Sequence, residues 1–337
     1  MLISISLCSI IAIFAGMSNK PKIVFLGTPD FAVPALATLV ENGYPISAVV
    51  TVPDKPAGRG QKILSSPVKQ FAEKHGLKIL QPANLKDESF VNELKALNAD
   101  LQIVVAFRML PEVVWNMPKL GTFNLHGSLL PQYRGAAPIN WAIINGEKKT
   151  GVTTFFLKQE IDTGNIIFHE EVEITNDDNV ETLHDKLMKV GSQLVLKTVQ
   201  AIESGKIKSI DQSTLSTDTL KIAPKLNREN TRLPLTKNPE ETRNFIRGLS
   251  PYPAAHSEFF NDNGIGFSVK IFNADAIMES HNQAIGKIET DNKSYLRIYL
   301  SGGYISINEL QLSGRNKMKI RDFLNGIKFE GNWKANK

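Results

Sequence analysis

The chain has 337 residues, of which 42% are hydrophobic and 22% charged. This ordinary globular composition excludes collagen-like, low-complexity and wholly disordered chains, and the length suggests about two domains. A single cysteine, Cys8, excludes an intrachain disulfide and any zinc or iron–sulfur site built from several cysteines. The formal net charge of +5 favours a polyanionic partner such as nucleic acid.

The first sixteen residues stand apart, because Leu2 to Ala15 are almost entirely apolar. The run is shorter than the roughly 20 apolar residues of a membrane-spanning helix. It also lacks the positively charged start of a secretory signal. Met17 then leads directly into a first predicted strand. We therefore expect residues 1–16 to be a mis-called or non-native extension; a weak signal or membrane anchor and a genuine packed extension are the alternatives.

Strands and helices alternate over the next part of the chain. Continuous apolar runs are typical of buried parallel strands, and apolar residues at a spacing of 3.6 are typical of helices. The predicted strands are Lys22–Gly27, Ile46–Val52, Lys78–Gln81 and Leu101–Ala106, and the predicted helices are Phe31–Asn42, Val68–His75 and Phe90–Leu97. This alternation predicts a doubly wound α/β sheet of the Rossmann-like kind, with ligands at the carboxyl ends of the strands.

The same pattern continues to the end of the predicted first domain, residues 17–205. Further strands are expected at Gly121–His126, Gly151–Leu157 and Ile166–Ile174, and further helices at Trp141–Asn145 and Val180–Ser204. Residues 206–222 are polar and rich in Ser and Thr, which predicts a linker.

Residues 223–337 are predicted to form a second domain. After a helix at Pro239–Gly248, short strands are expected at His256–Phe260, Ser268–Asn273, Ala284–Thr290, Tyr295–Tyr299 and Tyr304–Gln311, with a last short piece at Phe323–Phe329. Short strands between Gly and Asn turns predict a small, OB-like β-barrel. Residues 1–205 carry 19 basic and 20 acidic side chains, whereas residues 206–337 carry 20 and 14. All of the net positive charge therefore belongs to the C-terminal part.

The strongest candidate site lies at the end of the strand that finishes with Asn124, Leu125 and His126. Because residues two apart on a strand share a face, Asn124 and His126 point the same way. A neutral histidine can move a proton near pH 7, and an asparagine amide can stabilise an oxyanion. The following Gly127 lets the backbone bend beside a ligand. A strand end with an internally satisfied polar pair is the alternative interpretation.

A second candidate is Asp162, in the turn Gln159–Asn165. An Asp in such a turn most often caps the turn itself. Beside a histidine, however, a carboxylate fixes the tautomer of the ring and raises its basicity. Asp162 joins Asn124 and His126 only if their strands are neighbours, and the spacing in the sequence leaves that open.

Two further segments bear on ligands. Gly27 ends the first strand, but the full G-x-G-x-x-G pattern is absent, which disfavours a dinucleotide site. The long loop Pro53–Pro67 carries Lys55, Arg59 and Lys62, whose positive charges are suited to phosphates. Solvation of an exposed loop is the other interpretation of these charges.

With these residues in view, the chain resembles the folate-dependent formyltransferases over nearly its whole length after Met17. The matching stretches are GTPDFAVP (27–34), PDKPAGRG (53–60), LHGSLLPQYRGAAPI (125–139), TGVTT (150–154), IDTGNI (161–166), KL (225–226) and DFLNG (322–326). Within that family, the PDKPAGRG loop and the basic C-terminal part resemble the member that acts on tRNA.

The resemblance implies a formyltransferase whose donor is 10-formyltetrahydrofolate and whose acceptor is methionine on initiator tRNA. It implies catalytic roles for Asn124, His126 and Asp162. It implies contacts to folate by Ser128, Leu129, Leu130 and Pro131, and contacts to the tRNA acceptor stem by Lys55, Arg59 and Lys62. We further expect no metal, no membrane, a cytoplasmic location and a monomer.

Some points depart from the family or stay open. Phe107 and Arg108 stand where the family commonly has Tyr and Gly, which puts the wall on the folate side in doubt. Lys317, Lys319 and Arg321 alternate along one face if that piece is extended, and are further candidates for tRNA contact. The alternatives are a formyltransferase for a small amine and a non-enzymatic RNA-binding protein on the same fold.

Overall fold

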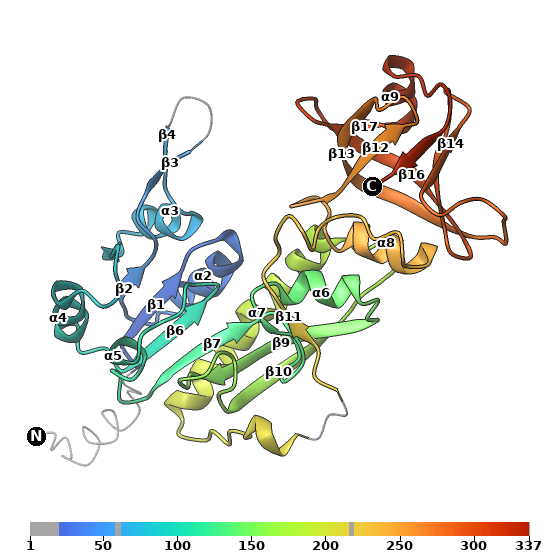
Figure 1. Ribbon diagram of the computed structural model, residues 1–337. Coiled ribbons are helices and arrows are strands. Elements are labelled where there is room, and N and C mark those ends of the chain that lie inside the picture. Colours follow the sequence, from blue (N-terminus) through green and yellow to red (C-terminus); the bar gives the residue numbers. More distant parts are fainter. Residues whose placement is uncertain (1–19, 58–61, 216–218, 337) are drawn as a thin grey trace, which may run out of the picture. The chain divides into compact units, whose positions relative to one another are not determined.

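The computed structural model describes residues 20–57, 62–215 and 219–336. It divides into two compact units, one made of the residues up to Leu125 with Val195–Ser209, the other of His126–Leu194 with Ile210–Lys337. Figure 1 shows the elements of both. The N-terminal sixteen residues and Arg59 lie outside the described residues. Among the described residues, no helix combines the length and apolarity needed to cross a membrane.

The first unit holds the parallel part of the predicted sheet. Its strands are β1 (Ile23–Gly27), β2 (Ile46–Val50), β5 (Ile79–Leu80), β6 (Leu101–Val105) and β7 (Thr122–His126). They lie side by side in the order β7-β6-β1-β2-β5, with every pair parallel (Figure 1). β1 and β6 are buried at every residue, as expected for strands covered on both faces. The predicted α/β architecture is confirmed.

Short helices lie between the strands of this unit. They are η1 (Asp30–Ala32), α2 (Val33–Glu41), α3 (Pro67–Lys74), α4 (Glu88–Ala96) and α5 (Glu112–Trp115), the last of which was not predicted. The Ser66 hydroxyl accepts from the third residue of α3, and the Asp87 carboxylate caps α4 in the same way.

The chain reverses its direction of travel across the sheet at β1. From β1 it moves outward to β2 and β5, then returns to the other side of β1 for β6 and β7. Such a reversal places a ligand crevice at the carboxyl ends of the two strands that flank it. At the end of β1, a side chain in place of Gly27 would meet the Cβ of Ala32 at 2.8 Å and the carbonyl of Val105 at 3.2 Å. A side chain here would clash with η1 and with β6, so the end of β1 requires glycine.

The second unit begins with the end of β7 and continues through two kinds of structure. Its first elements are β8 (Arg134–Gly135), α6 (Pro138–Ile144), β9 (Lys149–Phe156), β10 (Ile166–Glu173), α7 (Val180–Glu203), η2 (Gln212–Thr214) and β11 (Ile222–Ala223). The two strands predicted on either side of the turn at Gln159–Asn165 are present as β9 and β10, which pair antiparallel, and β8 pairs in parallel with β11.

The stretch that reads as a linker therefore makes ordered contacts. The backbone groups of Ile210 and Ile166 exchange two hydrogen bonds of 2.8 Å, and β11 carries the far end of the same stretch.

The C-terminal part is a closed antiparallel barrel preceded by a helix. Its elements are α8 (Pro239–Arg247), β12 (Ala255–Asn261), β13 (Gly266–Met278), β14 (Lys287–Thr290), β15 (Leu296–Leu300), β16 (Gly303–Leu312), β17 (Met318–Lys319), α9 (Ile320–Gly326) and β18 (Trp333–Ala335). The order β13-β12-β18-β14-β15-β16 closes through a β13–β16 pairing. The predicted barrel is confirmed, with one strand more than the five of an OB-fold.

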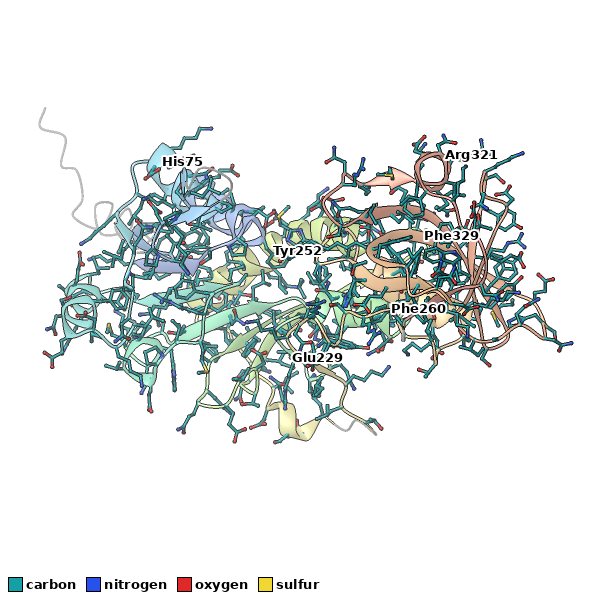
Figure 2. The ribbon with its side chains drawn as sticks, turned by 45° about the horizontal axis from the view of Figure 1, so that its top comes forward. His75, Glu229, Tyr252, Phe260, Arg321 and Phe329 are labelled. Carbon is teal, nitrogen blue, oxygen red and sulfur yellow. The ribbon has the colours of Figure 1, made fainter. Side chains whose placement is uncertain are left out.

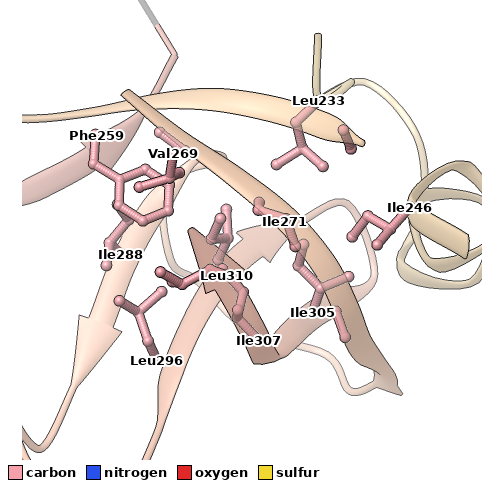
Figure 3. Close-up of a cluster of buried hydrophobic side chains, with 14 of the residues drawn as sticks. Leu233, Ile246, Phe259, Val269, Ile271, Ile288, Leu296, Ile305, Ile307 and Leu310 are labelled. Atoms are coloured by element: carbon pink, nitrogen blue, oxygen red, sulfur yellow. The ribbon is translucent and has the colours of Figure 1, made fainter. Parts of the chain in front are cut away.

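The interior of the barrel is filled by aliphatic and aromatic side chains, in keeping with the alternating burial along β12 and β13. Figure 3 shows Phe259, Ile271, Ile305 and Leu310 packed together, with Ile246 of α8 beside them.

One C-terminal prediction is wrong. Phe323–Phe329 is not a strand, because α9 runs from Ile320 to Gly326 and turns Phe323 into the core. The sixth strand of the barrel is β18 instead, which the sequence reading missed.

Helix α8 is tied to the segment before α7. Its Arg247 is only 8% exposed, and the guanidinium donates to the carbonyls of Thr175 (2.9 Å) and Asp178 (2.7 Å). Asn140 of α6 also donates to the carbonyl of Gly248 at the end of α8 (2.9 Å). These bonds join the barrel's leading helix to the rest of the second unit.

Candidate active site

The carboxyl end of β7 places a histidine in a dry environment. His126 is 6% exposed, and the ring of Phe155 meets it edge to face at 6.4 Å. Its Nε2 atom lies 2.9 Å from the carbonyl oxygen of Tyr133. Since a carbonyl can only accept, Nε2 carries a hydrogen, and Nδ1 is the ring atom available to take a proton.

Asp162 faces that available atom. Its Oδ2 lies 3.8 Å from His126 Nδ1, and the same oxygen accepts the backbone N–H of Gly135 at 3.0 Å. Asp162 has a φ of +55°, an uncommon conformation for a residue with a side chain. The Nδ1 lone pair of His126 and the carboxylate of Asp162 repel each other unless a proton lies between them. The pair is therefore suited to receive one proton during a reaction.

Asn124 lies two residues before His126 on the same strand and is half-buried. The buried neighbours Phe123 and Leu125 point to the opposite face, as predicted. Within the described residues, no hydrogen bond engages the Asn124 side-chain amide. Its N–H groups are thus available to a ligand.

The carboxylate of Glu147 fixes the loop that follows β7. The Tyr133 hydroxyl donates to this carboxylate at 2.5 Å, and Lys221 donates to the same oxygen at 2.5 Å. Burial and the bond to Glu147 raise the pKa of Tyr133 well above its ordinary value. The Tyr133 carbonyl that holds His126 is thereby fixed in place.

Gly135 shows why a glycine stands at this position. Its φ is +123°, and a Cβ there would lie 2.5 Å from the carbonyl oxygen of Ala223. The close approach of β8 and β11 therefore requires glycine, and it aims the Gly135 N–H at Asp162.

The residues predicted to contact folate follow His126 in the chain and are held by hydrogen bonds. Ser128 is fully buried; its hydroxyl donates to the carbonyl of Gln132 at 2.7 Å, and its carbonyl accepts from Thr153 at 2.6 Å. Leu130 is also buried, and its N–H donates to the Thr153 hydroxyl. Leu129 is half-buried and Pro131 is buried. The polar groups of Ser128 are thus used inside the protein.

Arg108, the departure from the family pattern, braces two loops of the first unit. Its guanidinium donates to the carbonyl of Ala83 at 2.8 Å and to the carbonyl of Pro82. Together with Lys86 and Met109, it lines a cavity of about 510 Å³ at the carboxyl ends of β5 and β6. The Arg108 side chain therefore lines this cavity and holds the backbone of Pro82 and Ala83, which a glycine could not do.

The basic loop after β2 is a hairpin. β3 (Lys55–Ala57) pairs with β4 (Lys62–Leu64), an arrangement that the sequence reading missed. Lys55 is exposed, Lys62 lies on the second strand, and Arg59 falls outside the described residues.

The three C-terminal basic residues do not share a strand face. Lys319 ends β17 and Arg321 lies in α9, so the predicted alternation is wrong at Arg321. Figure 2 shows Arg321 on the outer side of α9, whereas Phe329 lies in the barrel interior. Lys317 is paired with Glu309 at 3.1 Å.

The barrel carries a cavity of about 550 Å³ with a different basic lining. Arg228, Tyr252, His256 and Lys270 line it, and among the residues that the structure describes no acidic side chain does. Tyr252 is 79% exposed (Figure 2). Burial and the nearby Arg228 lower the pKa of His256.

No cluster of three His, Cys, Asp or Glu side chains suited to a metal ion occurs among residues 20–57, 62–215 and 219–336. Sequence reasoning missed Gly135 and Gln212, which both contact the loop of Asp162. Gly135 lies in the stretch 125–139 that matches the formyltransferase family, so that motif could have identified it. No feature of the local sequence marks Gln212.

Family models match both parts of the chain. The model of the formyl transferase family matches residues 21–199, and that of the formyl transferase C-terminal domain matches residues 225–328. The methionyl-tRNA formyltransferase of Bacteroides fragilis is 55% identical over 307 residues, which cover 91% of this chain and 95% of that relative. The same-named protein of Flavobacterium johnsoniae is 52% identical over 311 residues, covering 92% and 98%.

Solved structures share the fold at low identity. A sugar 3N-formyl transferase, WlaRD, solved with dTDP and 5-N-formyl-THF, has a TM-score of 0.60 and 22% identity, covering 88% of this chain and 100% of that chain. HypX from Aquifex aeolicus, solved with tetrahydrofolic acid, has a TM-score of 0.60 and 18% identity, covering 93% and 49%.

Proposed function

We propose that this chain, which belongs to the formyl transferase family, transfers a formyl group from 10-formyltetrahydrofolate to the free amino group of methionine on initiator methionyl-tRNA. The product is the N-formylmethionyl-tRNA with which translation begins. The observation that carries the proposal is the set at the end of β7: an Asn124 amide that makes no hydrogen bond within the described part of the chain, and a histidine whose Nδ1 faces a carboxylate at 3.8 Å.

Each of the three residues has a role in moving a formyl group to an amine. When bound, the formyl-folate supplies the carbonyl that the methionine amine attacks. The Asn124 amide donates to the carbonyl oxygen as negative charge develops on it. His126 accepts the proton of the attacking amine at Nδ1 and passes it to the departing folate nitrogen. Asp162 stabilises the imidazolium that exists between these two transfers.

The residues present fit a folate donor. Asn124 and His126 present an unused donor and an unused acceptor on one strand face, and the half-buried Leu129 follows them in the chain. No covalent intermediate on the protein is needed, because a deprotonated amine is already a nucleophile.

Basic residues other than the three reacting groups would hold the tRNA. The C-terminal part carries the net positive charge of the chain, and the cavity lined by Arg228 and Lys270 offers cations for phosphates. Exposed Tyr252 beside them offers a face on which a base can stack. Lys55 and Lys62 of the two paired strands, and Arg59 between them in the sequence, are proposed contacts to the acceptor stem. We place the protein in the cytoplasm as a monomer.

One assay separates this function from its alternatives. The purified chain is given 10-formyltetrahydrofolate with methionyl-tRNA, with glycinamide ribonucleotide, or with no acceptor. Formylation of methionyl-tRNA alone is expected. Formylation of the small amine instead would point to a small-substrate enzyme, and tRNA binding without formyl transfer would point to an RNA-binding protein on this fold.

A further inference from the structure

Gln212 is a buried polar residue in a segment that reads as a linker. It opens η2 and is only 3% exposed, whereas its neighbours Ser213 and Thr214 are exposed. The preceding Asp211 caps this short helix by accepting the N–H of Ser213 at 2.9 Å. The turn that presents Gln212 is therefore set locally.

Every hydrogen-bonding position of the Gln212 side chain is used. Its Nε2 donates to the carbonyl of Asp162 at 3.0 Å and to the carbonyl of Gly164 at 2.7 Å. Its Oε1 accepts from Nε of Arg134 at 3.1 Å and from Nη2 of the same guanidinium at 2.7 Å. An amide has two donor hydrogens and two acceptor lone pairs, so the side chain is fully satisfied.

These bonds close a ring around the carboxylate of Asp162. Gln212 holds the backbone of Asp162 on one side and the side chain of Arg134 on the other. Gly135, the next residue after Arg134, donates its N–H to the Asp162 carboxylate. One amide therefore fixes both the residue that carries the carboxylate and the strand that binds it.

The held loop has little freedom of its own. Gly164 approaches the Phe156 carbonyl so closely that an added Cβ would lie 1.5 Å from it. A turn of the Asp162 peptide would swing the carboxylate relative to His126 Nδ1, which is 3.8 Å away. Misplacement of a reacting group by about 1 Å can cost about 100-fold in rate.

We infer that Gln212 is a positioning residue for formyl transfer, which sets the carboxylate of Asp162 against His126 from within the interdomain segment. This inference rests on the proposed function. Because Gln212 acts through Asp162 and does not hold either substrate, its loss lowers the turnover number and leaves substrate affinity unchanged.

Two variants and one control test the inference. Gln212→Glu keeps the shape and the acceptor for Arg134 but removes both donors to the loop carbonyls. Gln212→Met keeps the volume and removes all four bonds. Thr214→Ala, in the same short helix, removes an exposed hydroxyl that bonds to the carbonyl of Asp211. The measurements are kcat and KM for both substrates, the single-turnover rate, and thermal unfolding.

For Gln212→Glu and Gln212→Met, kcat and the single-turnover rate should fall by about 10- to 100-fold while both KM values change by less than about 3-fold. Thr214→Ala should match the native chain. The inference is overturned if either variant keeps kcat within twofold, if KM rises instead, or if activity falls only in step with the folded fraction. If the native chain forms no N-formylmethionyl-tRNA, the proposed function is overturned, and with it the reaction in which Gln212 would act.

Discussion

The Nδ1 atom of His126 lies 3.8 Å from the Oδ2 atom of Asp162, while Nε2 of the same ring is bound to the Tyr133 carbonyl at 2.9 Å. The two ring nitrogens therefore have different tasks. The bond at Nε2 fixes the ring and its tautomer, and Nδ1 is left to accept and return the proton beside the Asp162 carboxylate. A single hydrogen bond to a backbone carbonyl thus decides which side of the ring is chemically active.

The charge of Asp162 should matter more than its shape. Asp162→Asn keeps the size of the side chain but cannot stabilise an imidazolium, so kcat should fall by about 10²–10⁴-fold. Steady-state formylation of methionyl-tRNA measures this. Glu160→Gln, an exposed change in the same turn, should leave kcat unchanged. A value for Asp162→Asn within threefold of the native one would contradict the assigned role.

Gly135→Ala should damage both stability and catalysis. The added Cβ would sit 2.5 Å from the Ala223 carbonyl in a backbone conformation that disfavours side chains, which costs about 1–3 kcal/mol. The displaced N–H would also lose its aim at Asp162.

Chemical denaturation and kcat measure these two effects. Gly331→Ala is the matched control, since Gly331 also has positive φ but an added Cβ meets no atom within 4 Å. Equal losses of stability in both variants would show that backbone strain alone, and not the contact with Ala223, is responsible.

Asp178 should make the fold sensitive to acid in a defined window. Burial raises its pKa, but hydrogen bonds from Lys186, Thr175 and Thr182 outweigh this and lower the pKa to about 2 from 3.8. Because the folded-state pKa is depressed, the stabilisation is complete above about pH 4 and is lost as the pH falls toward 2. It amounts to about 2 kcal/mol at neutral pH.

Asp178→Asn should lower the free energy of unfolding at pH 7 and flatten its dependence on pH between 4 and 2. Urea unfolding across that range measures both. The exposed neighbour serves as control through Asp177→Asn. If Asp178→Asn kept the native slope between pH 4 and 2, the stabilisation would have to come from other carboxylates.

The barrel cavity should contribute to tRNA affinity through charge. Arg228→Ala and Lys270→Ala should each weaken binding of initiator tRNA and reduce the slope of log K against log salt by about 1, because each removes one phosphate contact. Filter binding at several salt concentrations measures this. Lys293→Ala, an exposed change outside the cavity, should leave the slope unchanged. An unaltered slope in both cavity variants would place the tRNA elsewhere on the protein.

The sequence by itself determined most strands of the α/β sheet and the local half of the site. Apolar runs located the buried strands β1 and β6, and the two-residue period of a strand put Asn124 and His126 on one face. These features depend on backbone geometry within a few residues, so spacing is enough to predict them. The family motifs in the same stretches pointed to formyl transfer.

The family resemblance pointed to Asp162, but only the tertiary structure decided which distant residues contact one another in the site. Asp162 follows His126 by 36 positions in the chain, and Gln212 lies in a polar stretch with no motif. Their contacts depend on how β8, β11 and η2 pack, which no local pattern records. The same limit explains the error at Arg321, because packing of Phe323 and Leu324 into the barrel core favours a helix there. The spacing of residues along a strand determines which side chains share a face. Which faces come into contact depends on the burial of side chains that lie far apart in the sequence.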